Sequence, residues 1–75
     1  DHLMIIRHAD KVGVLAGILN LLRTDRHNIQ EMENIIFEGG EAACVRIQLV
    51  GHPSPKLIDT ISSNDNVFSI SVSAL

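Results

Sequence analysis

The order of hydrophobic and polar positions divides the chain into alternating strands and helices. Residues 2–8 form an apolar, partly β-branched run that stops at a polar cluster, which predicts a strand buried on both faces. After a short loop, the apolar positions of residues 14–24 recur at i, i+3, i+4 and i+7. This spacing predicts a helix with one buried stripe, made of Leu15, Ile18, Leu19 and Leu22.

The middle of the chain has the pattern of a β-hairpin. Residues 29–37 predict a strand, but its apolar phase changes between Ile29 and Met32, which indicates either a bulge or a second face covered by another subunit. Gly39-Gly40 follows, and both glycines tolerate the positive φ of a tight turn. Beyond the turn, apolar side chains alternate with polar or small ones, as in an antiparallel strand with one core face: Ala43, Val45, Ile47 and Leu49.

The last third of the chain predicts a second helix and a final strand. Ser54 offers an N-cap hydroxyl and Pro55 suits the first helical position. The buried stripe of this helix is predicted to be Leu57, Ile58 and Ile61. The final strand alternates the apolar set Phe68, Ile70, Val72 and Ala74 with Ser69, Ser71 and Ser73, which predicts one dry and one wet face.

This order of elements predicts the fold class. Strand, helix, strand, strand, helix, strand fits an α+β, ferredoxin-like βαββαβ sandwich, in which a four-stranded antiparallel sheet carries two helices on one face. The other face would then present the three serines together with Arg46 and Gln48. With 75 residues, the chain (1–75) has room for one domain and one core.

Composition and charge narrow the functional classes. A core this small, with a lone cysteine (Cys44) and therefore no internal disulfide, favours self-association and a reduced, cytoplasmic setting. We expect no membrane partner, because no apolar run approaches the length of a span. The net charge of −3 and the scattered basic residues argue against nucleic acid. No metal site is expected, because one cysteine and the widely separated His2, His27 and His52 lack metal-ligand spacing.

Short motifs distributed over the whole chain resemble those of the ACT domain. They are Asp10-x-x-Gly13-Val14-Leu15, Asn28-Ile29 at the start of the second strand, and Gly39-Gly40 before an alanine-rich strand. Within that superfamily, His8-x-Asp10 and the run Glu33-Asn34-Ile35 most resemble the C-terminal regulatory domain of D-3-phosphoglycerate dehydrogenase, the NAD-dependent enzyme of serine biosynthesis.

The resemblance implies a non-catalytic, allosteric domain without a cofactor of its own. Such domains pair side by side into a continuous sheet and hold an amino acid, L-serine in many of these dehydrogenases, between two copies. The implied ligand-binding residues are His8, Asp10, Gly13, Val14 and Leu15, with Asn28 from the neighbouring subunit. Two positions depart from the pattern, since Val12 stands where proline is usual and Asp10 where serine-sensing members carry asparagine. A ligand-free pairing module and the ACT domain of another amino-acid-metabolism enzyme therefore stay open.

Each candidate residue also has a purely structural interpretation. His8 could be a surface histidine at a strand end, and Asp10 could cap the first helix. Gly13 could serve loop geometry alone, Asn28 could hold a positive φ, and Cys44 could be a small core or interface residue. No catalytic residue is predicted, because His8 and Asp10 share a strand end without a nucleophile nearby in the sequence.

Overall fold

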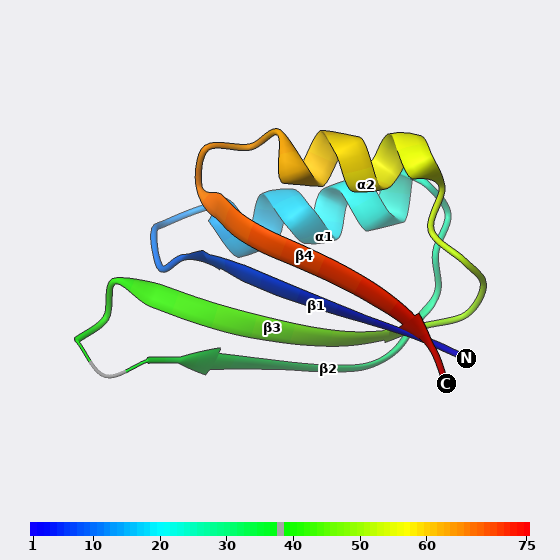
Figure 1. Cartoon of the computed structure of the whole chain (residues 1–75), viewed down its shortest axis with the longest axis horizontal. Helices are drawn as coiled ribbons and strands as arrows, with labels where there is room; N and C mark the ends of the chain where they lie inside the picture. The colour runs from blue at the N-terminus through cyan, green and yellow to red at the C-terminus, as the bar shows by residue number, and fades with distance from the viewer. Residues whose placement is uncertain (38) are drawn as a thin grey trace.

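The computed structural model describes residues 1–37 and 39–75, and within these residues the chain forms four strands and two helices (Figure 1). They are β1 (His2–Ala9), α1 (Val14–Thr24), β2 (Ile29–Ile36), β3 (Ala42–Leu49), α2 (Pro55–Ser62) and β4 (Val67–Ala74). The strand order is β2-β3-β1-β4, and every neighbouring pair is antiparallel. The predicted ferredoxin-like sandwich is confirmed, because each helix links two strands that lie parallel with a third between them.

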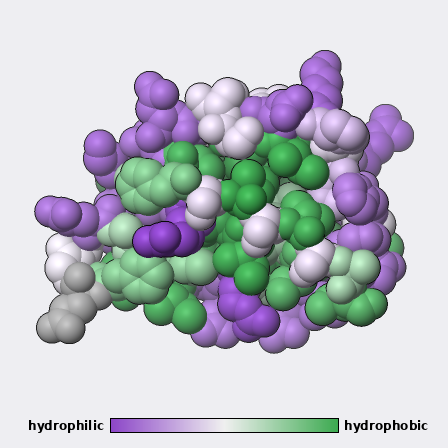
Figure 2. Space-filling model, viewed as in Figure 1, coloured by the Kyte–Doolittle hydropathy of each residue, from purple (hydrophilic) through white to green (hydrophobic). Residues whose placement is uncertain are grey.

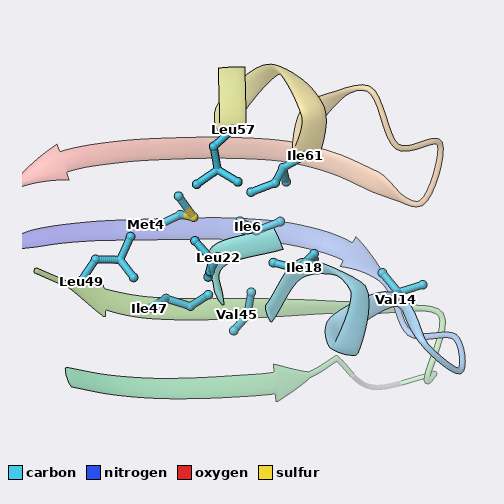
Figure 3. Close-up of a cluster of buried hydrophobic side chains, with 10 residues drawn as sticks. All are labelled: Met4, Ile6, Val14, Ile18, Leu22, Val45, Ile47, Leu49, Leu57 and Ile61. Carbon is cyan, nitrogen blue, oxygen red and sulfur yellow. The ribbon is translucent and has the colours of Figure 1, made fainter. Parts of the chain in front are cut away.

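The core lies between the sheet and the two helices, where side chains from β1 and β3 meet those of α1 and α2 (Figure 3). Its fully buried members on α1 are Val14, Ile18 and Leu22, whereas Leu15 and Leu19 are half-buried. The predicted stripe is thus rotated toward Val14. Seven of the first nine residues of α1 are apolar, so the helix has apolar side chains on more than one face. Tertiary contacts therefore decide which of these faces packs against the sheet. On α2, Leu57 and Ile61 are buried as predicted and Ile58 is half-buried.

Both edge strands contain an irregularity in register. In β2 the pairing with β3 shifts between Ile29 and Glu31, which confirms the bulge predicted from the change of apolar phase. In β4 the pairing with β1 shifts opposite Arg7 and His8. Because of that shift, the prediction that Phe68 lies on the dry face of the last strand is wrong. Val67 lies on the core side at this point, and Phe68 is 56% exposed.

The start of α2 follows the predicted capping chemistry. Ser54 has an extended backbone, and its hydroxyl accepts a hydrogen bond of 3.1 Å from the backbone N–H of Leu57. Pro55 occupies the first helical turn, where its missing N–H costs no hydrogen bond.

Replacing Ser54 with alanine should lower the free energy of unfolding by about 1 kcal/mol, because the N–H of Leu57 loses its acceptor. Urea denaturation measures this change. Ser69→Ala, on the exposed face of β4, is the matched control and should change stability little. Equal losses in the two variants would contradict the capping role.

The sheet face opposite the helices is open in the single chain. The cross-strand register lines up its side chains in three rows from β2 to β4. The rows are Glu31, Gln48, Leu3 and Ser73; Glu33, Arg46, Ile5 and Ser71; and Ile35, Cys44, Arg7 and Ser69. Leu3 and Ile5 are only half-buried, so the expectation that β1 is buried on both faces is not met within one chain. Cys44 is half-buried on this face and is not a core residue.

Candidate functional site

The loop between β1 and α1 is held in place through its backbone. The N–H of Ala9 donates to the carbonyl of Asn66 at 2.7 Å, and the N–H of Asp10 donates to the carbonyl of Glu41 at 3.1 Å. Past these anchors the loop turns outward, and Val12, at 105% relative exposure, is fully in solvent. The loop is therefore fixed at its base by both neighbouring connections, while its tip is open to a partner or ligand.

The first turn of α1 presents backbone donors without acceptors. Gly13 stands at the N-cap with φ 85°, a left-handed conformation that favours glycine, and no side chain caps the helix. Among the described residues, the N–H groups of Leu15 and Ala16 form no hydrogen bond. The interpretation of Asp10 as the helix cap is therefore wrong. The side chain of Val14 is buried, so residues 13–15 can meet a ligand through their backbone.

His8 is buried beneath this loop and is not a surface histidine. It is 2% exposed, and both of its ring nitrogens have partners. Nδ1 lies 3.0 Å from the carbonyl oxygen of Ala9, and Nε2 lies 3.0 Å from Oδ1 of Asn34 on β2. A ligand hydroxyl could bond His8 only by replacing one of these partners. In the single chain His8 connects the end of β1 with the edge strand.

Asn34 is the functional neighbour that reading the sequence did not single out as a site residue. Its partner His8 is 26 positions away in the sequence, and β3 lies between their two strands. The contact spans β3 above Ala43, which is directly opposite His8 and fully buried. The side chain at position 43 is small, which suits a bridge that passes from β1 to β2 across β3. Asn34 stands out once the register is known, because it is a polar residue opposite the core-facing Val45. The sequence alone does not show this register.

Asn28 lies at the other end of the sheet from His8 and Asp10. It precedes Ile29, which pairs with Leu49, and Leu49 pairs with His2 at the start of β1. The six residues that separate His2 from His8 rise about 20 Å along the strand, at about 3.3 Å each. One chain therefore does not bring Asn28 to the loop. The suggestion that Asn28 holds a positive φ is also wrong, because among the described non-glycine residues Arg26 has that conformation (φ 61°).

The remaining histidines gather at the same end of the sheet as Asn28. The rings of His2 and His52 meet edge to face with centroids 5.0 Å apart. The sequence favours a solvated side chain for His27, and this prediction is wrong. Its Nε2 lies 2.9 Å from Asp25 Oδ2, and only 10% of its side chain is exposed. Within residues 1–37 and 39–75, no group of three or more His, Cys, Asp or Glu side chains could hold a metal ion. No helix of that part is long and apolar enough to cross a bilayer.

Comparison with known proteins first defines the fold class. No family model matches the chain, and no curated protein matches it. Among solved structures, a formyltetrahydrofolate deformylase from Pseudomonas putida KT2440 superimposes with a TM-score of 0.82 at 8% identity, covering 99% of this chain and 28% of that one. The quorum quenching acylase GqqA gives 0.76 at 22% identity, covering 95% and 38%. The chain thus spans well under half of both proteins.

A further similar structure is a domain of nearly the same length. The ACT domain from GTP pyrophosphokinase of Chlorobium tepidum superimposes with a TM-score of 0.71 at 19% identity, covering 96% of this chain and 95% of that domain. The chain therefore shares the ferredoxin-like fold of this ACT domain, and at these identities the likeness concerns the fold alone. The binding of serine and the dehydrogenase parent stay predictions.

Proposed function

We propose that the chain is an ACT-type regulatory domain that pairs with a second copy through β2 and binds an amino acid between the two copies. The observation that carries the proposal is the open first turn of α1, with free N–H groups at Leu15 and Ala16, above a loop anchored to the edge strand. The domain carries no catalytic step in this proposal. Its ligand favours one arrangement of the two paired domains, and this arrangement changes the activity of the enzyme to which they belong.

The first turn of α1 supplies the carboxylate site of the proposed cradle. Unpaired amides at a helix N-terminus and the positive end of its dipole attract an anion. Gly13 has no Cβ, and a Cβ built there would meet nothing within 4 Å, so the approach to the backbone is open. Asp10 is exposed next to this turn and can accept from the ligand's ammonium group. The loop therefore has one site for each charge of an amino acid.

The β2 edge supports pairing with a second copy. An exposed edge strand offers unpaired backbone groups to another strand unless lysine or proline blocks it. β2 contains neither, and its two charged residues, Glu31 and Glu33, lie on the open face of the sheet. Large apolar side chains along or just after it are 41–56% exposed: Met32, Ile35, Ile36 and Phe37. A small core with this edge uncovered gains stability when a twin strand covers it. The half-buried Leu15 and Leu19 of α1 would extend the same interface.

A two-fold axis at the middle of β2 completes the site with Asn28. When β2 pairs antiparallel with its own copy about Met32, the helices of both copies stay on the same face of the joint sheet, and position 28 of one chain lies opposite position 36 of the other. Ile36 belongs to the same end of the sheet as His8, since both pair with Ala43. The partner's Asn28 then reaches the end at which the loop of the first chain stands, and its amide can donate to and accept from the ligand.

The hydrogen bond from His8 to Asn34 gives a path for regulation. It joins the base of the ligand loop to the strand through which the copies pair. A ligand that replaces one of His8's partners, or that tightens the loop, changes the free energy of pairing, and coupling of this kind amounts to about 1 to 3 kcal/mol. Ligand binding and dimer strength should therefore change together.

The parent enzyme we propose is D-3-phosphoglycerate dehydrogenase, an NAD-dependent cytoplasmic enzyme, with L-serine as the effector. The support is the resemblance in His8-x-Asp10 and residues 33–35 described above. Another enzyme of amino-acid metabolism is the alternative, and Asp10 in place of asparagine favours an effector other than serine.

Calorimetric titration of the 75-residue chain with L-serine and then the other amino acids tests the sensing function. We expect at least one to bind, and Asp10→Ala to weaken it about tenfold or more, because the ammonium group loses a charged acceptor. Asp59→Ala, an exposed aspartate on α2, is the matched control and should leave binding unchanged. Absence of heat with every amino acid, or equal losses in the two variants, would remove the sensing function.

A ligand-free pairing module is the second candidate, favoured by the exposed Asp10 carboxylate beside the anion site and by the fully exposed Val12. This candidate predicts dimers whose dissociation constant is the same with and without every amino acid. Sedimentation of the chain in both conditions separates it from the first.

A further inference from the structure

The open face of the sheet contains a hollow apart from the loop after β1, on the face of β2, β3 and β1 that lies away from the helices. Its volume is about 120 Å³, and it is lined by Leu3, Glu31, Glu33, Arg46 and Gln48. This volume holds several water molecules, and therefore also the head group of a small organic molecule. Figure 2 shows hydrophobic side chains across the middle of the molecule in this view, where β4 and β1 lie, and hydrophilic ones around its rim.

The charged groups of the hollow form no ion pair with any residue that the structure describes. Glu33 lies directly opposite Arg46 across the β2–β3 ladder, yet among the described residues neither forms an ion pair within 4.0 Å, and neither does Glu31. Both glutamates and the arginine are exposed. The two strands that carry these charges are about 4.8 Å apart at their backbones, so carboxylates and a guanidinium stand on adjacent strands without forming an ion pair.

We propose that this hollow binds a free α-amino acid with an aliphatic side chain, as a second ligand site distinct from the cradle between paired copies. The order of groups across the strands matches such a molecule. Glu31 and Glu33 on β2 take the ammonium group, and the planar fork of Arg46 on β3 takes the carboxylate. Leu3 and Ile5 on β1 lie opposite Gln48 and Arg46, so they provide an apolar surface next to the charged groups for the aliphatic side chain of the ligand.

The three kinds of group occur in the order that one zwitterion requires. An α-amino acid carries its ammonium and carboxylate on the same carbon, so its acceptor and donor must be neighbours, as the facing β2 and β3 residues are. Gln48, half-buried and opposite Glu31, adds an amide that can bond either charged end. A ligand with a single charge would leave one side of the hollow unmatched, which provides the basis for selectivity.

This site does not rest on the proposed function, because all of its groups come from one chain. The cradle needs the loop after β1 and the partner's Asn28, whereas the hollow lies on the face away from the helices. It should bind its ligand in a monomer as well as in a dimer. Since its charged groups are exposed and screened by solvent, we expect a dissociation constant on the order of 1 mM.

Titration of the isotopically labelled 75-residue chain with L-leucine, followed by amide NMR, tests the proposal. We expect saturable shifts at Leu3, Glu33, Arg46 and Gln48, and smaller ones in residues 10–15. Leucinamide lacks the carboxylate and 4-methylpentanoate lacks the ammonium group, so each should bind at least about fivefold more weakly. Arg46→Gln should weaken L-leucine by a similar factor. Arg7→Gln, which removes another exposed arginine of the same face outside the hollow, is the matched control and should leave the affinity unchanged.

Each other outcome overturns the proposal. No shift up to the solubility limit of leucine excludes the ligand class. Equal binding of leucine and 4-methylpentanoate would show an apolar contact without zwitterion recognition. Shifts at Leu3 and Ser71, which lie on β1 and β4 away from the β2 edge, that follow protein concentration in the absence of ligand would show that a second copy covers this face instead. A failed serine titration leaves this result unaffected, because the two experiments report on different residues.

Discussion

His8→Ala should lower the free energy of unfolding by about 2 to 4 kcal/mol, a large loss for a domain of this size. The side chain is almost completely buried, and its removal leaves a cavity. It also removes the hydrogen bonds of the ring to Ala9 and Asn34, each of which contributes about 0.5 to 1.5 kcal/mol, although the carbonyl of Ala9 keeps the N–H of Lys11. Urea denaturation at a fixed pH measures the change.

His52→Ala is the matched control for this experiment. His52 is exposed, and its replacement should change stability by no more than about 0.5 kcal/mol. Asn34→Ala should reproduce part of the loss, since it removes one of the two His8 bonds. A loss below about 1 kcal/mol for His8→Ala would mean that the ring is not a structural link between β1 and β2.

Met32→Lys should weaken pairing of the chain about 100-fold or more, the largest effect expected on assembly. Met32 lies at the proposed two-fold axis, opposite its own copy, so in a symmetric pair the two new ammonium groups would stand close together. Lysine on an edge strand also opposes strand addition. Because Met32 is 41% exposed in the single chain, the fold itself should be little affected. Sedimentation velocity over a range of concentrations gives the dissociation constant.

Phe68→Lys provides the control on the opposite edge of the sheet. Phe68 is exposed on β4 to a similar or greater degree, and its replacement should leave the dissociation constant unchanged. Loss of pairing in Phe68→Lys with none in Met32→Lys would move the interface from β2 to β4.

Local signals predicted the elements of this fold well. The helix over residues 14–24, the Ser54 cap and the bulge after Ile29 each depend on residues close together in the sequence, and all three are confirmed. The misplaced positions depend on packing between distant segments. α1 has apolar side chains on more than one face, and its packing against the sheet buries Val14 more completely than the predicted Leu15. The shift in β4 that exposes Phe68 occurs opposite Arg7, on another strand.

The candidate site was predictable to a smaller extent. Gly13 and the open helix end could be anticipated from the loop sequence, because glycine before an apolar helical stripe marks a helix start. The bridge from His8 to Asn34 could not, since it needs the register of two ladders, the bulge in β2 and the small side chain of Ala43 all at once. The distance of Asn28 from the loop followed only from strand order. This distance makes a second copy necessary to the proposed cradle.

Mixing two defective chains tests most directly whether the amino-acid site is shared between copies. Asp10→Ala and Asn28→Ala should each weaken binding of the effector about tenfold or more when alone, so that neither variant fills its sites at an effector concentration near the dissociation constant of the unmodified chain. In an equimolar mixture, half of the dimers contain one chain of each variant. In each mixed dimer, one of the two sites combines the unmodified loop of the Asn28→Ala chain with the unmodified Asn28 of the Asp10→Ala chain. Calorimetry should then recover binding at about a quarter of the sites. No recovery in a mixture whose dimers have exchanged would contradict a site built from two chains.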